Sequence, residues 1–152
     1  MLFRSLKEDL GTWDASIEML TPGAPSTPTT GVETNTLSCG GLCLATDFKG
    51  TVMGAPFEGH GVMTWDPAKK KYVGTWSDSM TTGLAATEST WDSAKKVMDS
   101  TMLTPDGSGG TARMRSTVQY TADGKRVFTM FMPGPDGKEM PSMRITYTRQ
   151  KK

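Results

Sequence analysis

The stretch GTWDASIEML, residues 11–20, alternates apolar and polar side chains, and this alternation decides the fold class. Successive side chains of an extended strand point to opposite faces, so one face carries Trp13, Ala15, Ile17 and Met19. The other face carries Asp14, Ser16 and Glu18. The two-residue period therefore predicts a strand whose tryptophan face is buried.

Short runs rich in Val, Thr, Tyr, Phe and Trp continue along the chain, separated by turn signals such as WDPAKKK, TPDGSGG and PGPDGK. Such runs are typical of strands, and short loops between them require antiparallel pairing. We expect one short helix in FRSLKEDL, residues 3–10, and strands over 11–20, 30–38, 42–52, 57–65, 71–78, 84–91, 96–103, 111–120, 125–132 and 140–149. A meander this long closes to remove its edges, which predicts an all-β, up-and-down antiparallel barrel, with a β-sandwich as the alternative.

Length and charge limit the classes of protein that the chain can belong to. The 152 residues predict a single domain over 1–152, with 17 basic and 16 acidic residues and a net charge of +1. This balance argues against a nucleic-acid binder, and no apolar run reaches the ~20 residues of a membrane span. The first residues have no apolar signal-peptide region, so we expect a cytoplasmic protein, with a secreted form whose signal was removed as the alternative.

Alternation also indicates the inner face of two later strands, but leaves two others without a defined inner face. In 140–149, Arg149 ends the face that also carries Met143, Ile145 and Tyr147. In 111–120, the alternation predicts an inner face made of Ala112, Met114, Val118 and Tyr120. Strands 71–78 and 125–132 carry large side chains on both faces, so alternation does not orient them.

The Gly11-x-Trp13 motif behind a short helix, with Arg149 ending the last strand, resembles the calycin (lipocalin-like) pattern. This resemblance implies that Trp13 packs across the closed end of the barrel with Arg149 over its ring. A cation above an indole face is worth roughly 0.5–2 kcal/mol. The pair would also join the first strand to the last.

Longer motifs resemble the bacterial domain-of-unknown-function family 1579, in the same order and over about residues 3–150. They are LGTW (10–13), MGAPFEGHGVMTWDPAKKKYVGTWSDSM (53–80), GPDGKE (134–139) and ITYTR (145–149). The resemblance implies a lipocalin-like barrel and no particular activity. The cysteines of SCGGLC are not part of the family pattern.

Those two cysteines, Cys39 and Cys43, are expected to be free structural thiols. Residues four apart in a regular strand share a face but lie about 13 Å apart, whereas a disulfide needs Cα atoms within roughly 7 Å. A sharp bend at Gly40-Gly41 would be needed to join them. Two cysteines and one histidine also fall short of a structural zinc set.

Residues able to carry chemistry are few. His60 is the one histidine; it is either a haem or metal ligand or, as alternation favours, a solvent-facing residue. The sequence has no nucleophile elbow, zinc-protease motif, phosphate loop or dinucleotide fingerprint. These observations favour a binding protein over an enzyme and predict neither a cofactor nor a metal site.

The function that we expect is non-enzymatic binding of a small hydrophobic or amphipathic molecule in the barrel. The expected lining is Trp76, Met98, Met102, Met114, Phe128, Met130 and Tyr147, with Glu88 as a polar anchor of raised pKa. Twelve methionines are present. They fit a flexible apolar lining, plain core filling or a thioether copper site.

Two other functions stay open. The first is an isomerase- or cyclase-like enzyme that uses the barrel as a reaction chamber, with Glu88, Asp78 or His60 moving protons. The second is an interaction module, such as a homodimer that forms through a strand edge or an outer apolar patch.

Overall fold

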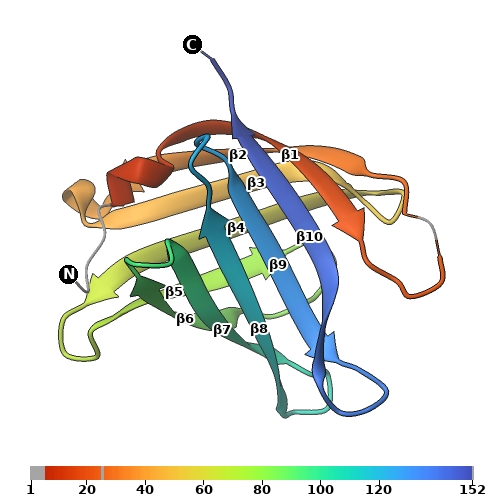
Figure 1. Cartoon of the computed structure of the whole chain (residues 1–152). Helices are drawn as coiled ribbons and strands as arrows, with labels where there is room; N and C mark the ends of the chain where they lie inside the picture. Colours follow the sequence, from red (N-terminus) through yellow and green to blue (C-terminus); the bar gives the residue numbers. More distant parts are fainter. Residues whose placement is uncertain (1–5, 25, 152) are drawn as a thin grey trace.

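Ten strands form one closed antiparallel barrel in the computed structural model, which describes residues 6–24 and 26–151 (Figure 1). Two short 3-10 helices, η1 (Leu6–Asp9) and η2 (Cys39–Gly41), accompany the sheet. In the described residues, no helix is long and apolar enough to span a membrane. The strands are β1 (Gly11–Met19), β2 (Thr29–Ser38), β3 (Cys43–Val52), β4 (Ala55–Asp66), β5 (Lys71–Asp78), β6 (Ala85–Asp92), β7 (Val97–Pro105), β8 (Thr111–Tyr120), β9 (Arg126–Pro133) and β10 (Glu139–Arg149).

The order of the strands around the barrel is the order in the sequence, which confirms the predicted up-and-down architecture. Each strand pairs with the next, and β10 closes the barrel by pairing with β1, from Trp13 opposite Arg149 to Met19 opposite Met143. Dimerisation through a free strand edge, one of the expected forms of an interaction module, has no edge to use in this closed sheet.

The helix expected over residues 3–10 is a single 3-10 turn, η1, and Phe3 lies outside the described residues. The side chain of Leu6 from η1 is buried and packs with Leu44, Tyr72 and Met98. One short turn is enough to place an apolar side chain over this end of the barrel. Figure 1 shows η1 at the end of the sheet where β1 begins.

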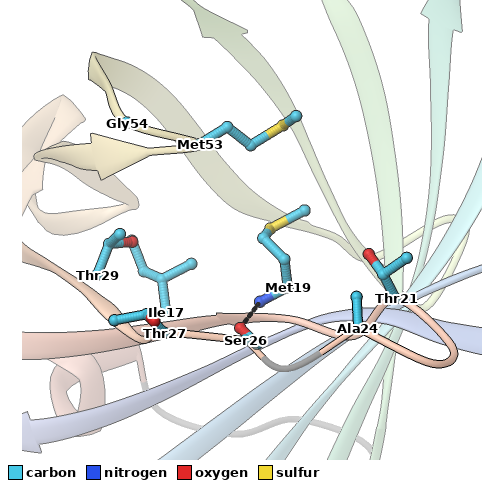
Figure 2. Close-up of a pocket in the computed structure, with 9 residues that line it drawn as sticks. All are labelled: Ile17, Met19, Thr21, Ala24, Ser26, Thr27, Thr29, Met53 and Gly54. Carbon is cyan, nitrogen blue, oxygen red and sulfur yellow. Dashed lines mark hydrogen bonds between the residues drawn. The ribbon is translucent and has the colours of Figure 1, made fainter.

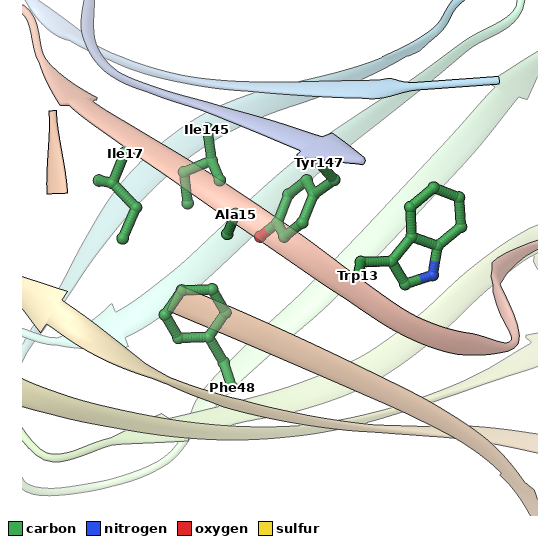
Figure 3. Packing of buried hydrophobic residues seen from close by; sticks show 6 residues of the cluster. All are labelled: Trp13, Ala15, Ile17, Phe48, Ile145 and Tyr147. Carbon is green, nitrogen blue, oxygen red and sulfur yellow. The ribbon is translucent and has the colours of Figure 1, made fainter. Parts of the chain in front are cut away.

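Burial confirms the inner face predicted from the first strand. Trp13, Ala15 and Ile17 are buried, whereas Asp14 and Ser16 are exposed. The inner face of β10 likewise carries buried Ile145 and Tyr147, and Phe48 of β3 completes the same core cluster (Figure 3).

Strand register resolves the two strands that alternation left ambiguous. Paired residues of adjacent strands point to the same face, so the pairing of Phe128 with Ile145 places Phe128, Met130 and Met132 inside. The pairing of Tyr72 with Trp65 and of Trp76 with Gly61 places the Tyr72 face of β5 inside. Core partners on neighbouring strands therefore decided the orientation.

The two WD-x-AKK segments are hairpin turns, as their composition predicts. The Oδ1 atom of Asp66 accepts hydrogen bonds from the backbone amides of Ala68 and Lys69, at 2.9 and 3.1 Å. Asp92 does the same for Ala94 and Lys95, both at 3.0 Å. Each aspartate therefore caps its bend, and the lysines lie in solvent.

The expectation of free thiols is wrong, because Cys39 and Cys43 form a disulfide with their Cα atoms 5.3 Å apart. The strand spacing assumed from the sequence does not apply, since η2 interrupts the extended chain between them. Gly40 (φ 65°) and Gly41 (φ 95°) occupy the left-handed region that glycine adopts without a steric penalty. The bend at these glycines brings the two sulfur atoms together.

Candidate functional site

The two ends of the barrel differ in what covers them. At one end lie η1, the last residues of β10 and the hairpin turns that follow β2, β4, β6 and β8; we call it the closed end. At the other lie the loops that follow β1, β3, β5, β7 and β9; we call it the open end. The rim of the open end carries exposed apolar side chains, including Met53, Met80, Leu84 and Met132.

Trp13 fills the closed end between two arginines. The guanidinium carbon of Arg149 lies 4.1 Å from the centroid of the indole, and that of Arg126 lies 4.0 Å from it. Arg149 also donates hydrogen bonds to the backbone carbonyls of Leu10 and Glu8. The predicted pair of Trp13 and Arg149 is therefore present at the seam between β1 and β10.

Gly11 makes room for this packing. Its φ of +109° is one that residues with a side chain rarely adopt, and a Cβ atom there would lie 3.1 Å from Nη1 of Arg149. Gly11 and Trp13 of the GTW motif therefore both contribute to the packing that seals this end of the barrel.

Arg126, which the sequence analysis did not identify, is the buried cation of the closed end. Its Nη2 donates to Oε1 of Glu33 at 2.8 Å, and its Nη1 lies 3.4 Å from Oδ1 of Asp9. Burial by itself lowers the pKa of Arg126, but the charges of Glu33 and Asp9 outweigh it and hold this pKa above its ordinary value. The guanidinium also lies 4.7 Å from the ring centroid of Tyr147.

Further polar groups complete this network. The Nδ2 atom of Asn35 donates to Oε1 of Glu33 at 2.7 Å and to the carbonyl of Asp9 at 3.0 Å, and Asn35 accepts from Thr46 at 2.6 Å. Burial, followed by the nearby charge of Glu33, raises the pKa of Tyr147 well above its ordinary value. Because these groups bind one another, the closed end is a structural plug.

Toward the open end, Ile17 is still buried at 1 % exposure, but several other inward-facing side chains are less completely buried. Trp76, Met102, Met114, Phe128 and Met130 are half-buried. In the closed half, by contrast, Tyr72 is 0 % and Met98 4 % exposed.

Seven methionines gather on the inner wall of this half, on β1 and on β7 to β10. Register places Met102 opposite Met114, Met143 between Met19 and Met130, and Met132 opposite Met140. We call these seven residues the methionine patch. Direct cross-strand neighbours have Cβ atoms about 4.5–5.5 Å apart, so the thioether side chains form one continuous surface.

Trp76 forms the facing wall. A Cβ atom at Gly59 would lie 2.3 Å from the indole, and one at Gly61 would lie 3.0 Å from it, so the ring lies directly on the backbone of β4. The indole Nε1 donates to Oδ2 of Asp78 at 2.9 Å, which fixes the ring orientation. Glycines at these two positions are required for this packing.

A cavity of about 240 Å³ opens between the end of β1, the loop after it and the β3–β4 turn (Figure 2). Its lining is Ile17, Met19, Thr21, Ala24, Ser26, Thr27, Thr29, Met53 and Gly54. The backbone amide of Met19 donates to Oγ of Ser26 at 3.1 Å and ties the loop to the strand. Sequence reasoning missed this mouth because loop positions show no alternation that would indicate an inner face.

Seven of the eight residues expected to line the interior do face it. Trp76, Met102, Met114, Phe128 and Met130 lie in the open half, whereas Met98 and Tyr147 lie in the buried closed half. The expectation that Glu88 faces the interior is wrong. Glu88 is paired with Val73 on the outer face and binds Lys69 at 2.6 Å and Lys71 at 3.1 Å.

The environment of Glu88 is therefore opposite to the one expected. Hydrogen bonds from the two lysines lower its pKa, whereas a carboxylate in an apolar interior would have a raised pKa.

His60 also lies on the outer face, as alternation favours, with Nδ1 2.8 Å from Oδ1 of Asp47. Both residues of this pair border an outer hollow of about 340 Å³. Across residues 6–24 and 26–151, no group of three or more His, Cys, Asp or Glu side chains is arranged to hold a metal ion.

These features define a closed antiparallel β-barrel with a buried ion network at one end and a group of methionines on the inner wall toward the other end. The chain belongs to the family described as protein of unknown function (DUF1579), whose sequence profile matches residues 3–149. This match confirms the family that the sequence motifs resemble.

Solved structures share the fold at low sequence identity. The protein Rv2717c from M. tuberculosis is 14% identical, with a TM-score of 0.67, and the match covers 99% of this chain and 100% of that chain. The S-type phycobiliprotein lyase CPES from Guillardia theta is 11% identical, with a TM-score of 0.62, and the match covers 96% of this chain and 90% of that chain. No curated protein sequence matches the chain significantly.

Proposed function

We propose that this protein binds a small apolar or amphipathic molecule in the open half of a lipocalin-like (calycin) barrel, between the methionine patch and Trp76. One observation carries the proposal: large apolar side chains face the interior but are not fully buried. Apolar surface that stays in contact with water is stabilised when a ligand covers it, at about 25 cal/mol per Å². Most small-molecule sites have such a lining, with a few polar groups.

Methionine suits a site of this kind because its side chain is unbranched and adapts to ligands of different shape. The cavity at the mouth, about 240 Å³, is slightly smaller than the ~300–1,000 Å³ of most drug-sized ligand sites. A larger ligand would therefore need Met19 and Met53, which extend into this mouth in Figure 2, to change rotamer. Because methionine side chains are unbranched, a change of rotamer has a low free-energy cost.

Similarity to other proteins supports the fold on which the proposal depends. A barrel of this type occurs in a phycobiliprotein lyase, and at 11% identity that similarity bears on the fold alone. The chemical argument for binding comes from the interior of this chain.

The alternative of an enzyme with acid–base chemistry inside the barrel loses support from two of its three residues. Glu88 and His60 lie on the outer face and bind Lys69, Lys71 and Asp47. The third, Asp78, faces inward but already accepts hydrogen bonds from Trp76 and from the backbone amides of Met80 and Thr81. We therefore favour binding.

The disulfide bears on the cellular compartment. Disulfides persist in oxidising environments and are rare in the cytosol. The bond between Cys39 and Cys43 therefore favours an oxidising compartment over the cytoplasmic location expected from the sequence. An outer apolar patch remains the route to the expected homodimer.

Binding can be tested by blocking the interior with a matched pair of variants. Met102 and Leu103 are adjacent on β7; Met102 faces the interior and Leu103, 45 % exposed, faces solvent. We expect saturable binding of the fluorescent probe N-phenyl-1-naphthylamine to the unmodified protein. Met102→Trp should weaken it at least tenfold, and Leu103→Trp should leave it unchanged.

The same variants show whether the space is real. If the open half is a cavity, Met102→Trp fills it and the denaturation midpoint changes little. A large loss of stability in Met102→Trp alone would mean that the interior is already filled. That result, or the absence of saturable probe binding, would exclude the proposed function.

A further inference from the structure

Three serines form a polar row across the inner wall of the barrel. Register places Ser89 of β6 opposite Ser100 of β7, and Ser100 opposite Ser116 of β8. We call this row the serine ladder. Ser89 is 4 % exposed, while Ser100 and Ser116 face the interior and are half-buried.

The serine ladder has hydrogen-bonding capacity left over. The Oγ atoms of Ser89 and Ser100 are 2.6 Å apart, so one hydroxyl donates to the other. Each hydroxyl has one donor and two acceptor positions, and within residues 6–24 and 26–151 the side chain of Ser116 makes no hydrogen bond. Ser116 therefore ends the row with a donor and acceptors directed to the interior.

On β7 and β8, apolar residues lie on both sides of the serine ladder, whereas on β6 the inward neighbour of Ser89 toward the open end is Thr87. Toward the closed end, the next inward pair is Met98 and Val118; toward the open end, it is Met102 and Met114. A polar group of a ligand that enters this half would find its hydrogen-bond partners at the level of the serines. Leaving such a group without a partner costs roughly 1–3 kcal/mol.

The charges near the serine ladder are already engaged. On the outer faces of β7 and β8, Arg115 binds Asp99 through two hydrogen bonds of 3.1 and 2.7 Å. Inside, the guanidinium of Arg126 is held by Glu33 and Asp9 in the closed end. A ligand carboxylate at the level of the serines would therefore be buried without a free cation, which is costly.

We propose that the serine ladder binds the polar group of the ligand, and that this group is an uncharged oxygen function such as a hydroxyl, ester or amide carbonyl. The apolar remainder of the ligand lies against the methionine patch and Trp76. This inference rests on the proposed function and adds the chemical class of the ligand.

Three probes of similar size test whether the ligand's polar group is uncharged, charged or not needed. They are naphthalene, 2-naphthol and 2-naphthoate, each measured at pH 7. They carry no polar group, a neutral hydroxyl and a carboxylate, respectively, and their own fluorescence reports binding. We expect 2-naphthol to bind most tightly and 2-naphthoate least tightly.

Ser116→Ala should weaken binding of 2-naphthol about fivefold, as expected for the loss of one net hydrogen bond, and leave naphthalene unchanged. Thr117→Ala is the matched control, because Thr117 is the next residue of β8 and faces outward opposite Asp99. Circular dichroism and thermal melts establish that both variants fold.

The outcomes separate the two proposals. If 2-naphthoate binds most tightly, or if Ser116→Ala affects naphthalene and 2-naphthol equally, the serine ladder does not recognise the ligand, although an apolar site exists. If none of the three probes shows saturable binding, the proposed function fails, and this inference fails with it.

Discussion

The guanidinium carbon of Arg126 lies 4.0 Å from the centre of the Trp13 indole, inside the closed end of the barrel. This stacking joins β9 to β1, two strands that do not pair directly. The same guanidinium binds Glu33 on β2. A single buried cation thus connects three parts of the sheet at the end where the barrel is sealed.

Replacement of Arg126 by Leu should destabilise the protein by about 3–5 kcal/mol, because it removes the buried cation that Glu33 binds. Urea denaturation at pH 7 measures this loss. Arg113→Leu is the matched control, since Arg113 is exposed on the outer face of β8. A loss below about 1 kcal/mol for Arg126→Leu would contradict a stabilising role of this network.

Trp13→Ala should cost about 3–5 kcal/mol of unfolding free energy, as removal of a large buried aromatic side chain does. Arg149→Ala should cost less, about 0.5–2 kcal/mol, because Arg149 is exposed, and its contacts are a cation–π contact and hydrogen bonds to the carbonyls of Leu10 and Glu8. Denaturant melts of both variants test this order. If Arg149→Ala costs more than Trp13→Ala, the tryptophan is not the principal plug.

Tyr147 should make the protein sensitive to alkali. Its pKa in the folded state is raised, first by burial and then by Glu33, whereas an unfolded tyrosine ionises near pH 10. Its contribution to stability is therefore complete below about pH 10 and is lost as the pH rises above that value. Tyr147→Phe should lose less stability between about pH 9 and 11 than the unmodified protein, measured by urea melts. Equal losses in the two proteins would show that Tyr147 does not carry the effect.

The disulfide should be present in protein purified without reductant. Intact mass spectrometry should give a mass two hydrogens below that of the dithiol, because Cys39 and Cys43 are joined. Loop-closure entropy for so short a loop predicts that Cys39→Ala/Cys43→Ala costs on the order of 2 kcal/mol. Reaction of two free thiols with a thiol reagent in the native, unreduced protein would contradict the bond.

Alternation predicted the inner face correctly where a strand is apolar on one side and polar on the other. Trp13, Ala15 and Ile17 show this on β1, and Ile145 and Tyr147 on β10. It failed for Glu88, because the inner face of β6 carries the hydroxyl residues Thr87 and Ser89, while Ala86 faces outward. Around Glu88, the inner face of β6 is therefore the polar one and the outer face carries the apolar residue, so alternation pointed to the wrong face.

Arg126 and Glu33 were missed for a related reason. Each has a charged side chain on a face that the sequence did not identify as buried, and a buried charge is stable only with a partner. Arg126 and Glu33 bind each other although they are 93 residues apart along the chain. A signal was present in strand 125–132, since Arg126 shares its face with Phe128 and Met130, but that strand is apolar on both faces.

The sequence by itself determined the strands, their turns, the antiparallel meander and the buried face of Trp13, because these depend on local alternation, turn residues and short loops. The packing of Trp13 against Arg149 was implied by the resemblance to the calycin pattern. Tertiary structure alone decided the disulfide, the ion network of Arg126, the serine ladder and the continuity of the methionine patch. Each of these depends on which residues of different strands stand opposite one another, or on a bend in the chain. Register and backbone geometry are set only when the whole barrel closes.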